Sequence, residues 1–223
     1  MVSEAHTLIM AFAVNAIGAR NVAQATDKCN AVLLHISTDY VFDGRKGQPY
    51  VEDDSPGPVN VYASSKLAGE YLVRATAVKH FVVRVSGLYG RHPCRGKGGR
   101  NFVTTMLRLG RERPEVRVVD DEFVSPTHTK DIGLQLPSLT QTEAYGTYHV
   151  AAHGHCSWYE FASKIFELAN MRTKVSVAMP GEFAGKTLRP HYTALSNASL
   201  HRLAIDRMPP WDESLKEFIR LIC

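Results

Sequence analysis

The stretch "AVLLHISTDYVFDG", residues 31–44, decides the fold that we expect for this chain. Its first part, Ala31 to Ile36, is an apolar run with the length of a buried strand. The polar side chains of Ser37, Thr38 and Asp39 follow at once. Such groups cost free energy when they are buried without partners, so they either cap a local turn or face a ligand.

The elements around this strand predict a parallel sheet. Residues 4–28 have the apolar spacing of a helix. Asn60 can cap a second helix that runs to about Ala77, and "HFVVRVS" at residues 80–86 is another continuous apolar strand. A strand, a helix and a strand at this spacing form a right-handed βαβ unit.

The rest of the chain alternates between helices and strands in a more mixed order. We predict helices over 101–113, from Thr127 or Thr129 to about 139, after Ser157, and twice near the C-terminus, with strands at 116–119, 146–151 and 174–177. The fold class is therefore α/β, with a partial doubly wound (Rossmann-like) parallel sheet and a smaller C-terminal α/β domain. We expect the domains to span 1–92 and 93–223, with elements at about 116–139 returning to the sheet.

Composition excludes several classes of function. The chain has 223 residues and a net charge of +4 without a long basic run, so we expect no nucleic-acid partner. Its densest basic stretch, 91–100, is more typical of a solvated loop than of an anion-binding site. The first twenty residues are interrupted by charges, so we expect no signal peptide and no membrane span.

Cysteine and histidine usage indicates a reducing compartment and no metal. The four cysteines are far apart and form no Cys-x-x-Cys pair, which favours a cytoplasmic protein. The stretch "HGHC", His153 to Cys156, is the one place that suggests a zinc site. No second pair of ligands is evident beside it, so we expect no metal there.

Tyr62 and Lys66 are the first candidates for catalysis. They lie four residues apart in the helix after Asn60 and so share one helical face. A free phenol has a pKa of about 10, and a nearby ammonium lowers it, so Tyr62 could exchange a proton near neutral pH. A half-buried tyrosine beside a solvated lysine is the commoner meaning of this spacing. The polar strand end at Thr38 favours the catalytic interpretation.

At this point the sequence resembles a known family. Thr38, Tyr62 and Lys66 are similar to the Ser/Thr–Tyr–Lys set of the extended short-chain dehydrogenase/reductases. The segments "STDYVFDG", "VYASSKLAGE", "NFVTTMLRLGRE", "GTYHVAA" and "SWYEFA" together look like dTDP-4-dehydrorhamnose reductases. The resemblance covers nearly the whole chain, and it implies a truncated dinucleotide-binding domain over 1–92 and a substrate domain over 93–223. It implies NADPH-dependent (or NADH-dependent) reduction of the 4-keto group of a nucleotide-linked deoxysugar.

The resemblance also assigns roles to residues. Tyr62 would donate a proton to the sugar oxygen, Thr38 would hydrogen-bond the keto oxygen, and Lys66 would bind the nicotinamide ribose and lower the pKa of Tyr62. Ser37, Tyr62 and Lys66 would contact the cofactor. The residues implied for the substrate are Asp39, Phe42, Asn101, Phe102 and Arg189.

Three departures from the family pattern bear on these roles. Ala63 replaces the glycine that follows the tyrosine, and Gly87 stands where the family often has a tryptophan over the sugar. The sequence also contains no Gly-x-x-Gly-x-x-Gly turn, which binds the cofactor pyrophosphate in this family. We therefore expect a looser sugar site, weak cofactor binding, weak turnover by the isolated chain, and an exposed sheet edge at 31–36 beside uncovered apolar surface.

Two other functions remain open. The regulatory beta subunit of methionine adenosyltransferase resembles this chain at "DYVFDG" and at Pro126 to Asp131, and it docks on a partner enzyme without catalysis. "NFVTTML" and "SWYEFA" favour the reductases. The other open possibility is an α/β domain that has no surviving activity. The expected partner is a nucleotide sugar, and the sequence leaves open a homodimer or a partner enzyme.

Overall fold

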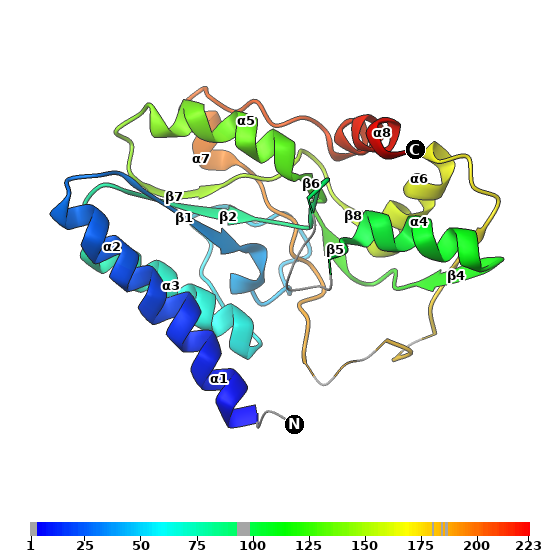
Figure 1. Ribbon diagram of the computed structural model, residues 1–223, viewed down its shortest axis with the longest axis horizontal. Helices are drawn as coiled ribbons and strands as arrows, with labels where there is room; N and C mark the ends of the chain where they lie inside the picture. Colours follow the sequence, from blue (N-terminus) through cyan, green and yellow to red (C-terminus); the bar gives the residue numbers. More distant parts are fainter. Residues whose placement is uncertain (1–3, 93–98, 180, 184, 186) are drawn as a thin grey trace.

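Helices cover both faces of a small central sheet (Figure 1). The computed structural model describes residues 4–92, 99–179, 181–183, 185 and 187–223. The sheet has the strand order β1 (Leu33–Thr38), β2 (His80–Val85) and β7 (Gly146–His149). Both pairings are parallel, so the predicted parallel sheet is confirmed. Strand β1 begins two residues later than expected and includes Ser37 and Thr38 themselves.

The alternation of side chains along β2 explains why the sheet is covered on both sides. Phe81, Val83 and Val85 point to one face and Val82 points to the other, as the pleat of a strand requires. On the first face lie α5 (Thr129–Thr140) and α7 (Ala198–Arg202). On the second face lie α2 (Ala19–Lys28) and α3 (Val61–Thr76).

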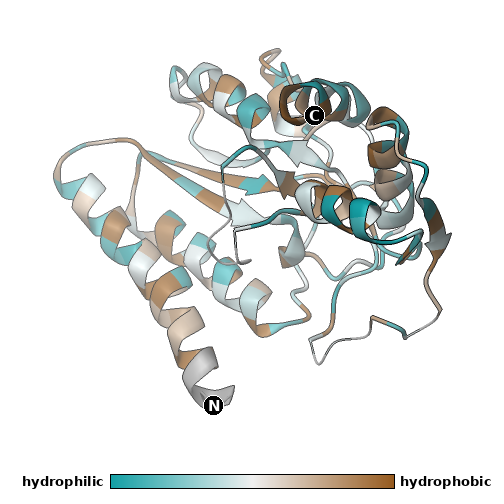
Figure 2. Cartoon of the chain, turned by 45° about the vertical axis from the view of Figure 1, so that its right-hand side comes forward, coloured by the Kyte–Doolittle hydropathy of each residue, from teal (hydrophilic) through white to brown (hydrophobic). Residues whose placement is uncertain are grey.

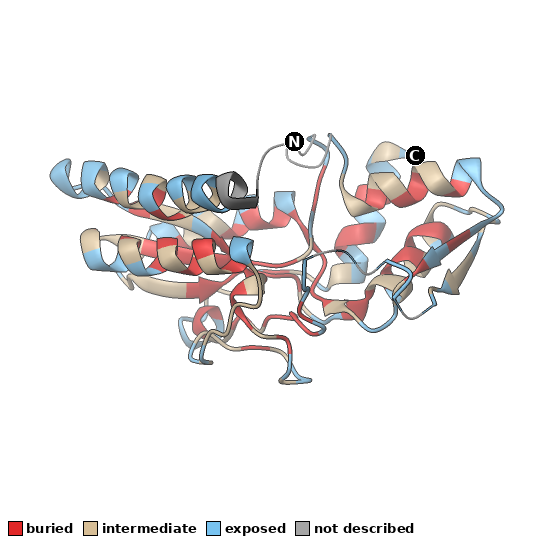
Figure 3. Cartoon of the chain, turned by 90° about the horizontal axis from the view of Figure 1, so that it is seen from below, coloured by how far each residue is buried: buried red, intermediate tan, exposed pale blue. Residues whose placement is uncertain are grey.

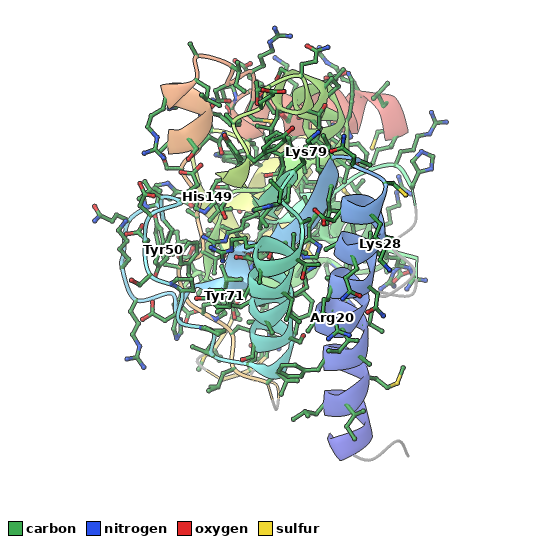
Figure 4. All side chains as sticks on the ribbon, turned by 90° about the vertical axis from the view of Figure 1, so that its left-hand side faces the viewer. Arg20, Lys28, Tyr50, Tyr71, Lys79 and His149 are labelled. Carbon is green, nitrogen blue, oxygen red and sulfur yellow. The ribbon has the colours of Figure 1, made fainter. Side chains whose placement is uncertain are left out.

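The N-terminal helix is continuous but changes its pitch. The helix predicted over 4–28 is present as α1 (Glu4–Phe12), the π-helical segment η1 (Ala13–Gly18) and α2. Segment η1 packs on α3 at Gly69, where an added Cβ would lie 2.1 Å from the Asn15 carbonyl oxygen. The Asn15 amide donates to the Ser65 hydroxyl at 3.0 Å in the same contact. Glycine and serine therefore allow the two helices, side by side in Figure 4, to approach closely.

Sequence signals placed the helix starts well, with one exception. Asn60 accepts a hydrogen bond from the Ala63 N–H at the start of α3, as predicted. Asn101 and Ser157 form capping boxes at two further predicted starts. The predicted cap at Thr127 or Thr129 is wrong, because α5 follows His128 without a side-chain cap.

A second core lies in the C-terminal half. It contains α4 (Phe102–Glu112), α6 (Trp158–Leu168) and α8 (Trp211–Ile222), packed with the two-stranded parallel sheet of β4 (Glu115–Val118) and β9 (Lys174–Val177). Its buried members include Phe161, Ile165 and Phe218. We predicted that elements at about 116–139 return to the central sheet. Helix α5 does pack on that sheet, whereas β4 pairs with β9 instead. The division at residues 92 and 93 stays a prediction.

Two further strand pairs, each of two-residue strands, lie outside the central sheet and the β4–β9 sheet. Strand β3 (Leu88–Tyr89) pairs with β6 (Thr127–His128), and β5 (Phe123–Val124) pairs with β8 (Cys156–Ser157). Strands of two residues carry no detectable period, so the sequence did not indicate them. The 3₁₀ turn η2 (Asp39–Val41) directly after β1 was also not predicted.

The expected exposed edge is present among the described residues. Strand β1 is a terminal strand of the central sheet, and a groove of about 280 Å³ separates it from η1 and α2. The outward sides of α1, η1 and α2 are exposed and carry apolar side chains (Figures 2 and 3). Among the described helices, none has both the length and the apolar character to cross a bilayer. Cys29, Cys156 and Cys223 are free thiols, and Cys94 lies outside the described residues, as does most of the basic stretch 91–100.

Candidate active site

One face of α3 lies along β1 and carries three polar side chains at successive helical turns. Tyr62, Lys66 and Glu70 occupy this face because residues four apart share one side of a helix. The Lys66 ammonium donates to the Ile36 carbonyl at 2.6 Å, and the Glu70 carboxylate accepts from the Ser37 hydroxyl at 2.5 Å. Helix α3 is thus fixed in register against the carboxyl end of β1.

Thr38 and Asp39 end β1 with a buried polar turn. The Thr38 Oγ1 donates to Asp39 Oδ1 at 3.0 Å and caps the 3₁₀ turn by accepting from the Tyr40 N–H at 3.3 Å. The other oxygen of Asp39 accepts from the Ser86 hydroxyl at 2.8 Å. Burial raises the pKa of Asp39, and these hydroxyl donors act against that rise. The turn interpretation of the opening stretch is therefore confirmed, and contact of these groups with a ligand stays a prediction.

The Tyr62 phenol is half-exposed, at 49 %, and its pKa is raised. Partial burial is the main cause and the charge of Asp39 adds to it, while the nearby Thr38 hydroxyl lowers the pKa. We expected Lys66 to lower the pKa of Tyr62, and this expectation is wrong for the structure. The Lys66 ammonium is engaged by the Ile36 carbonyl, and desolvation lowers its own pKa.

His35 adds a further titratable group beside Lys66 on β1. Burial and, to a smaller extent, the positive charge of Lys66 together lower the pKa of His35 to about 4. The imidazole is therefore neutral at pH 7. Sequence reasoning missed this contact, because a histidine inside an apolar run gives no local signal of the lysine that faces it.

Tyr40 is a second residue that sequence reasoning missed. Its ring meets the Tyr62 ring edge-on, with centroids 6.4 Å apart. Burial and the charge of Asp39 raise the pKa of Tyr40 to about 12, while Arg189 lowers it. Arg189 also lowers the pKa of Glu122, which burial raises. The structure therefore brings Arg189 to the Tyr40–Tyr62 end of the site, although it follows β1 by most of the chain.

Ser37 belongs to a buried ionic network. Its hydroxyl donates to Glu70, whose two carboxylate oxygens accept from Arg84 at 3.0 and 2.8 Å. Arg84 also lies 5.1 Å from the ring centroid of Phe42. This network links β1, β2 and α3 directly behind Tyr62 and Lys66. A contact between Ser37 and the cofactor stays a prediction.

The other residues implied for the substrate have packing roles. Phe42 is fully buried and stacks on Tyr50 at 4.1 Å. Asn101 caps α4, and its amide donates to the Gly90 carbonyl at 2.8 Å. Phe102 packs on Trp158, with ring centroids 4.5 Å apart. Asn101 and Phe102 are half-buried, and the substrate roles of all three residues stay predictions.

Gly87 cannot be replaced by a larger residue in this backbone. Its φ of +54° lies in the left-handed region, and an added Cβ would lie 2.5 Å from Val124 Cγ2 and 3.0 Å from Pro126 Cα. A tryptophan here, as the family often has, would need a different path of β3 and β5. The glycine that replaces the family's tryptophan at position 87 therefore fits the close packing of Val124 and Pro126 around it.

The arrangement is suited to proton transfer beside a bound cofactor. A half-exposed phenol, a buried threonine hydroxyl and an ammonium lie around the carboxyl end of a parallel strand, where ligands of such sheets bind. The Lys66 ammonium has three donors, of which the Ile36 carbonyl takes one, so it can still hold the hydroxyls of a ribose.

Comparison with known proteins places this geometry in a family. The family model described as the RmlD substrate binding domain matches residues 3–222. The chain is 40 % identical to the spore coat polysaccharide biosynthesis protein SpsK of Bacillus subtilis, over 94 % of this chain and 71 % of that protein. It is 32 % identical to the dTDP-4-dehydrorhamnose reductase of Escherichia coli, over 92 % of this chain and 71 % of that enzyme.

Solved structures agree with the sequence relatives. The crystal structure of dTDP-4-dehydrorhamnose reductase from Bacillus anthracis in complex with NADP superposes with a TM-score of 0.91 at 44 % identity, over 96 % of this chain and 74 % of that one. The corresponding reductase structure from Clostridium acetobutylicum gives 0.91 at 39 % identity, over 97 % and 75 %. The chain therefore belongs to the RmlD substrate-binding-domain family, which is the family of the dTDP-4-dehydrorhamnose reductases.

Proposed function

We propose that this chain reduces the 4-keto group of a dTDP-linked 6-deoxysugar, with NADPH as the hydride donor. The observation that carries the proposal is the convergence of Thr38, Tyr62 and Lys66 at the carboxyl end of β1. The relatives support the substrate class, since they are named dTDP-4-dehydrorhamnose reductase and, at 35 % identity, dTDP-4-keto-6-deoxy-D-glucose reductase. The NADP complex of the Bacillus anthracis reductase supports the cofactor.

The chain's own groups supply the proton and the orientation. Tyr62 is protonated at neutral pH, as any phenol with an ordinary or raised pKa is, so its hydroxyl can donate to the sugar O4 as a hydride arrives at C4. The Thr38 hydroxyl lies beside Tyr62 and can donate to the same oxygen, where negative charge develops. NADPH, when bound, supplies the hydride, and Lys66 would hold its ribose. The product is the 4-hydroxy sugar with oxidised cofactor.

Replacement of Tyr62 tests the assignment of the acid. We expect Tyr62→Phe to lower kcat by about 10²–10⁴-fold, the usual contribution of a positioned general acid. Tyr71 is the matched control, because it lies on the same helix, is exposed at 54 % and contacts Arg74. Tyr71→Phe should keep the activity of the unsubstituted chain.

The assay should follow the hydride as well as the cofactor. With dTDP-4-dehydrorhamnose and NADPH deuterated at the nicotinamide C4, we expect deuterium at C4 of the sugar product, measured by mass spectrometry and NMR. A folded chain that binds the dTDP-sugar but transfers no deuterium at millimolar cofactor would contradict the reductase proposal and favour a regulatory subunit.

The setting of the reaction is part of the same proposal. Free thiols at Cys29, Cys156 and Cys223 suit a reducing cytoplasm, which is where we place the chain. The nucleotide sugar is the small-molecule partner. A homodimer or a partner enzyme stays a prediction that measurement of molar mass in solution would test.

A further inference from the structure

We propose that His153, His201 and Asp206 form a binding site for a divalent transition-metal ion of the zinc type. One ligand atom from each residue, two imidazole nitrogens and a carboxylate oxygen, lies within 4.8 Å of the other two. The site is separate from the reductase site and does not depend on that function. We expected no metal at "HGHC" because no second ligand pair was visible. The structure brings His201 and Asp206 to His153 from a distant segment.

The distances suit a small cation. His201 Nε2 lies 2.7 Å from Asp206 Oδ2, and His153 Nε2 lies 3.5 Å from the same oxygen. The two imidazole rings are stacked, with centroids 5.5 Å apart and planes inclined by 15°. Tetrahedral zinc with bonds of about 2.0–2.1 Å separates neighbouring ligand atoms by roughly 3.3 Å. Small ring rotations therefore convert the present arrangement into a coordination shell.

The carboxylate of Asp206 is the second observation that points to a cation. Its side chain is only 4 % exposed, and Oδ1 accepts from the Met208 N–H at 2.9 Å. The other oxygen, Oδ2, is buried, makes no hydrogen bond of proper geometry and faces both imidazoles. The two imidazole nitrogens lie close to this buried oxygen, and a metal ion bound by all three groups would neutralise its charge.

The backbone holds the three ligands in place. The His153 N–H donates to the Pro209 carbonyl at 2.9 Å, and the His153 carbonyl accepts from the Trp211 N–H at 3.0 Å. His201 lies in the last turn of α7, whose end is closed by a bond from the Ala204 N–H to the His201 carbonyl at 3.0 Å. A metal here would tie the turn before α8 to the connection between β7 and β8.

The donor set selects the class of ion. Two imidazoles and one carboxylate favour zinc, cobalt or nickel over magnesium and calcium, which prefer oxygen ligands. The side chains of His153 and His201 are 40 % and 56 % exposed, so an ion from solution can enter and water can complete its shell. The competing explanation is a plain ion pair between His201 and Asp206.

Metal titration of the untagged full chain in reducing buffer tests the proposal. Zinc chloride alone, in equilibrium dialysis, should give one ion per chain at micromolar or tighter affinity. Cobalt chloride should give a visible absorption band from coordination. His201→Ala and Asp206→Asn should each weaken zinc binding at least about tenfold. The asparagine retains an Oδ1 acceptor for the Met208 N–H.

His191→Ala is the matched control. His191 faces Asp121 at 3.6 Å but belongs to no three-ligand group among the described residues. This variant should bind zinc as the unsubstituted chain does and show the same zinc-dependent rise in Tm, which His201→Ala should lack. Absence of zinc binding would overturn the proposal. Equal binding by all variants would also overturn it, because the ion would then be held elsewhere, for example by the exposed thiols of Cys29 and Cys223.

Discussion

The N-terminal helical layer and the C-terminal core bury opposite kinds of side chain. Segments α1, η1 and α2 bury small alanines, Ala16, Ala19 and Ala23, and expose Val14 and Val22 at 62 % and 52 %. Helices α4, α6 and α8 do the reverse: their large apolar side chains are buried in one continuous cluster, and polar groups face solvent. Both layers are helical and bury apolar side chains, but those of the first layer are small and those of the second are large.

This difference matters because the candidate active site lies beside the N-terminal layer. Strand β1 and helix α3 carry Thr38, Tyr62 and Lys66, and η1 packs closely on α3 at Gly69. The buried pair of Glu70 and Arg84 also joins α3 to β2. The comparison predicts that the two regions respond differently to the same kind of substitution.

Removing a large apolar side chain should give the largest contrast. Phe161 is fully buried in the C-terminal core, so Phe161→Ala should lower the free energy of unfolding by about 3–5 kcal/mol. Val14→Ala in the N-terminal layer should change it by less than about 0.5 kcal/mol, since Val14 is mostly exposed. Urea unfolding measures both. A large loss for Val14→Ala would show that its face is covered in solution.

Breaking an ion pair should have the opposite result, with the larger loss of stability beside the active site and the smaller one in the C-terminal core. Glu70→Gln leaves the charge of Arg84 buried without its partner, so it should cost about 3 kcal/mol and disorder the site. Glu112→Gln in α4 breaks an exposed pair with Arg108 and should cost less than about 0.5 kcal/mol. Equal effects of the two substitutions in urea unfolding would refute the role given to the buried pair.

Adding a methyl group should separate close packing from open surface. Gly69→Ala places a Cβ 2.1 Å from the Asn15 carbonyl oxygen, so η1 must move, at a cost of about 1–3 kcal/mol. Gly133→Ala is the matched control in α5, where nothing lies within 4 Å, and it should stabilise by about 0.5–1 kcal/mol. Thermal unfolding compares them, and hydrogen exchange should locate the Gly69→Ala effect in α2 and α3. A neutral Gly69→Ala would contradict the close approach.

Acid should weaken the central sheet through its buried histidines. Burial lowers the pKa of His149 to about 3, while the unfolded chain titrates near 6.5. The unfolded chain therefore binds more protons below pH 6.5, and stability falls as the pH falls. For His149 the loss between pH 6.5 and 5.5 should be about 1 kcal/mol. His149→Gln should remove that part of the pH dependence in urea unfolding, and an unchanged dependence would exclude His149 as its source.

The sequence by itself determined the regular elements and the identity of the chemistry. Apolar runs gave β1, β2 and the βαβ unit, and Asn60, Asn101 and Ser157 marked helix starts, because these signals lie within a few residues of the structures they specify. The spacing of Tyr62 and Lys66, read with the resemblance, indicated the candidate catalytic set. Short motifs predict an element correctly where the interactions that form it lie within a few residues of one another.

Only the tertiary structure decided the environments of these groups. The pKa of Tyr62 is raised, although the sequence suggested a lowered value, because burial acts through space and Lys66 is engaged by a strand carbonyl. Tyr40 and Arg189 reach the site, and His201 and Asp206 reach His153, through contacts between distant segments. Two-residue strands and the π-helical turn of η1 likewise depend on neighbours far along the chain. Burial and contacts between distant residues leave no local pattern in the sequence, so only the folded structure determines them.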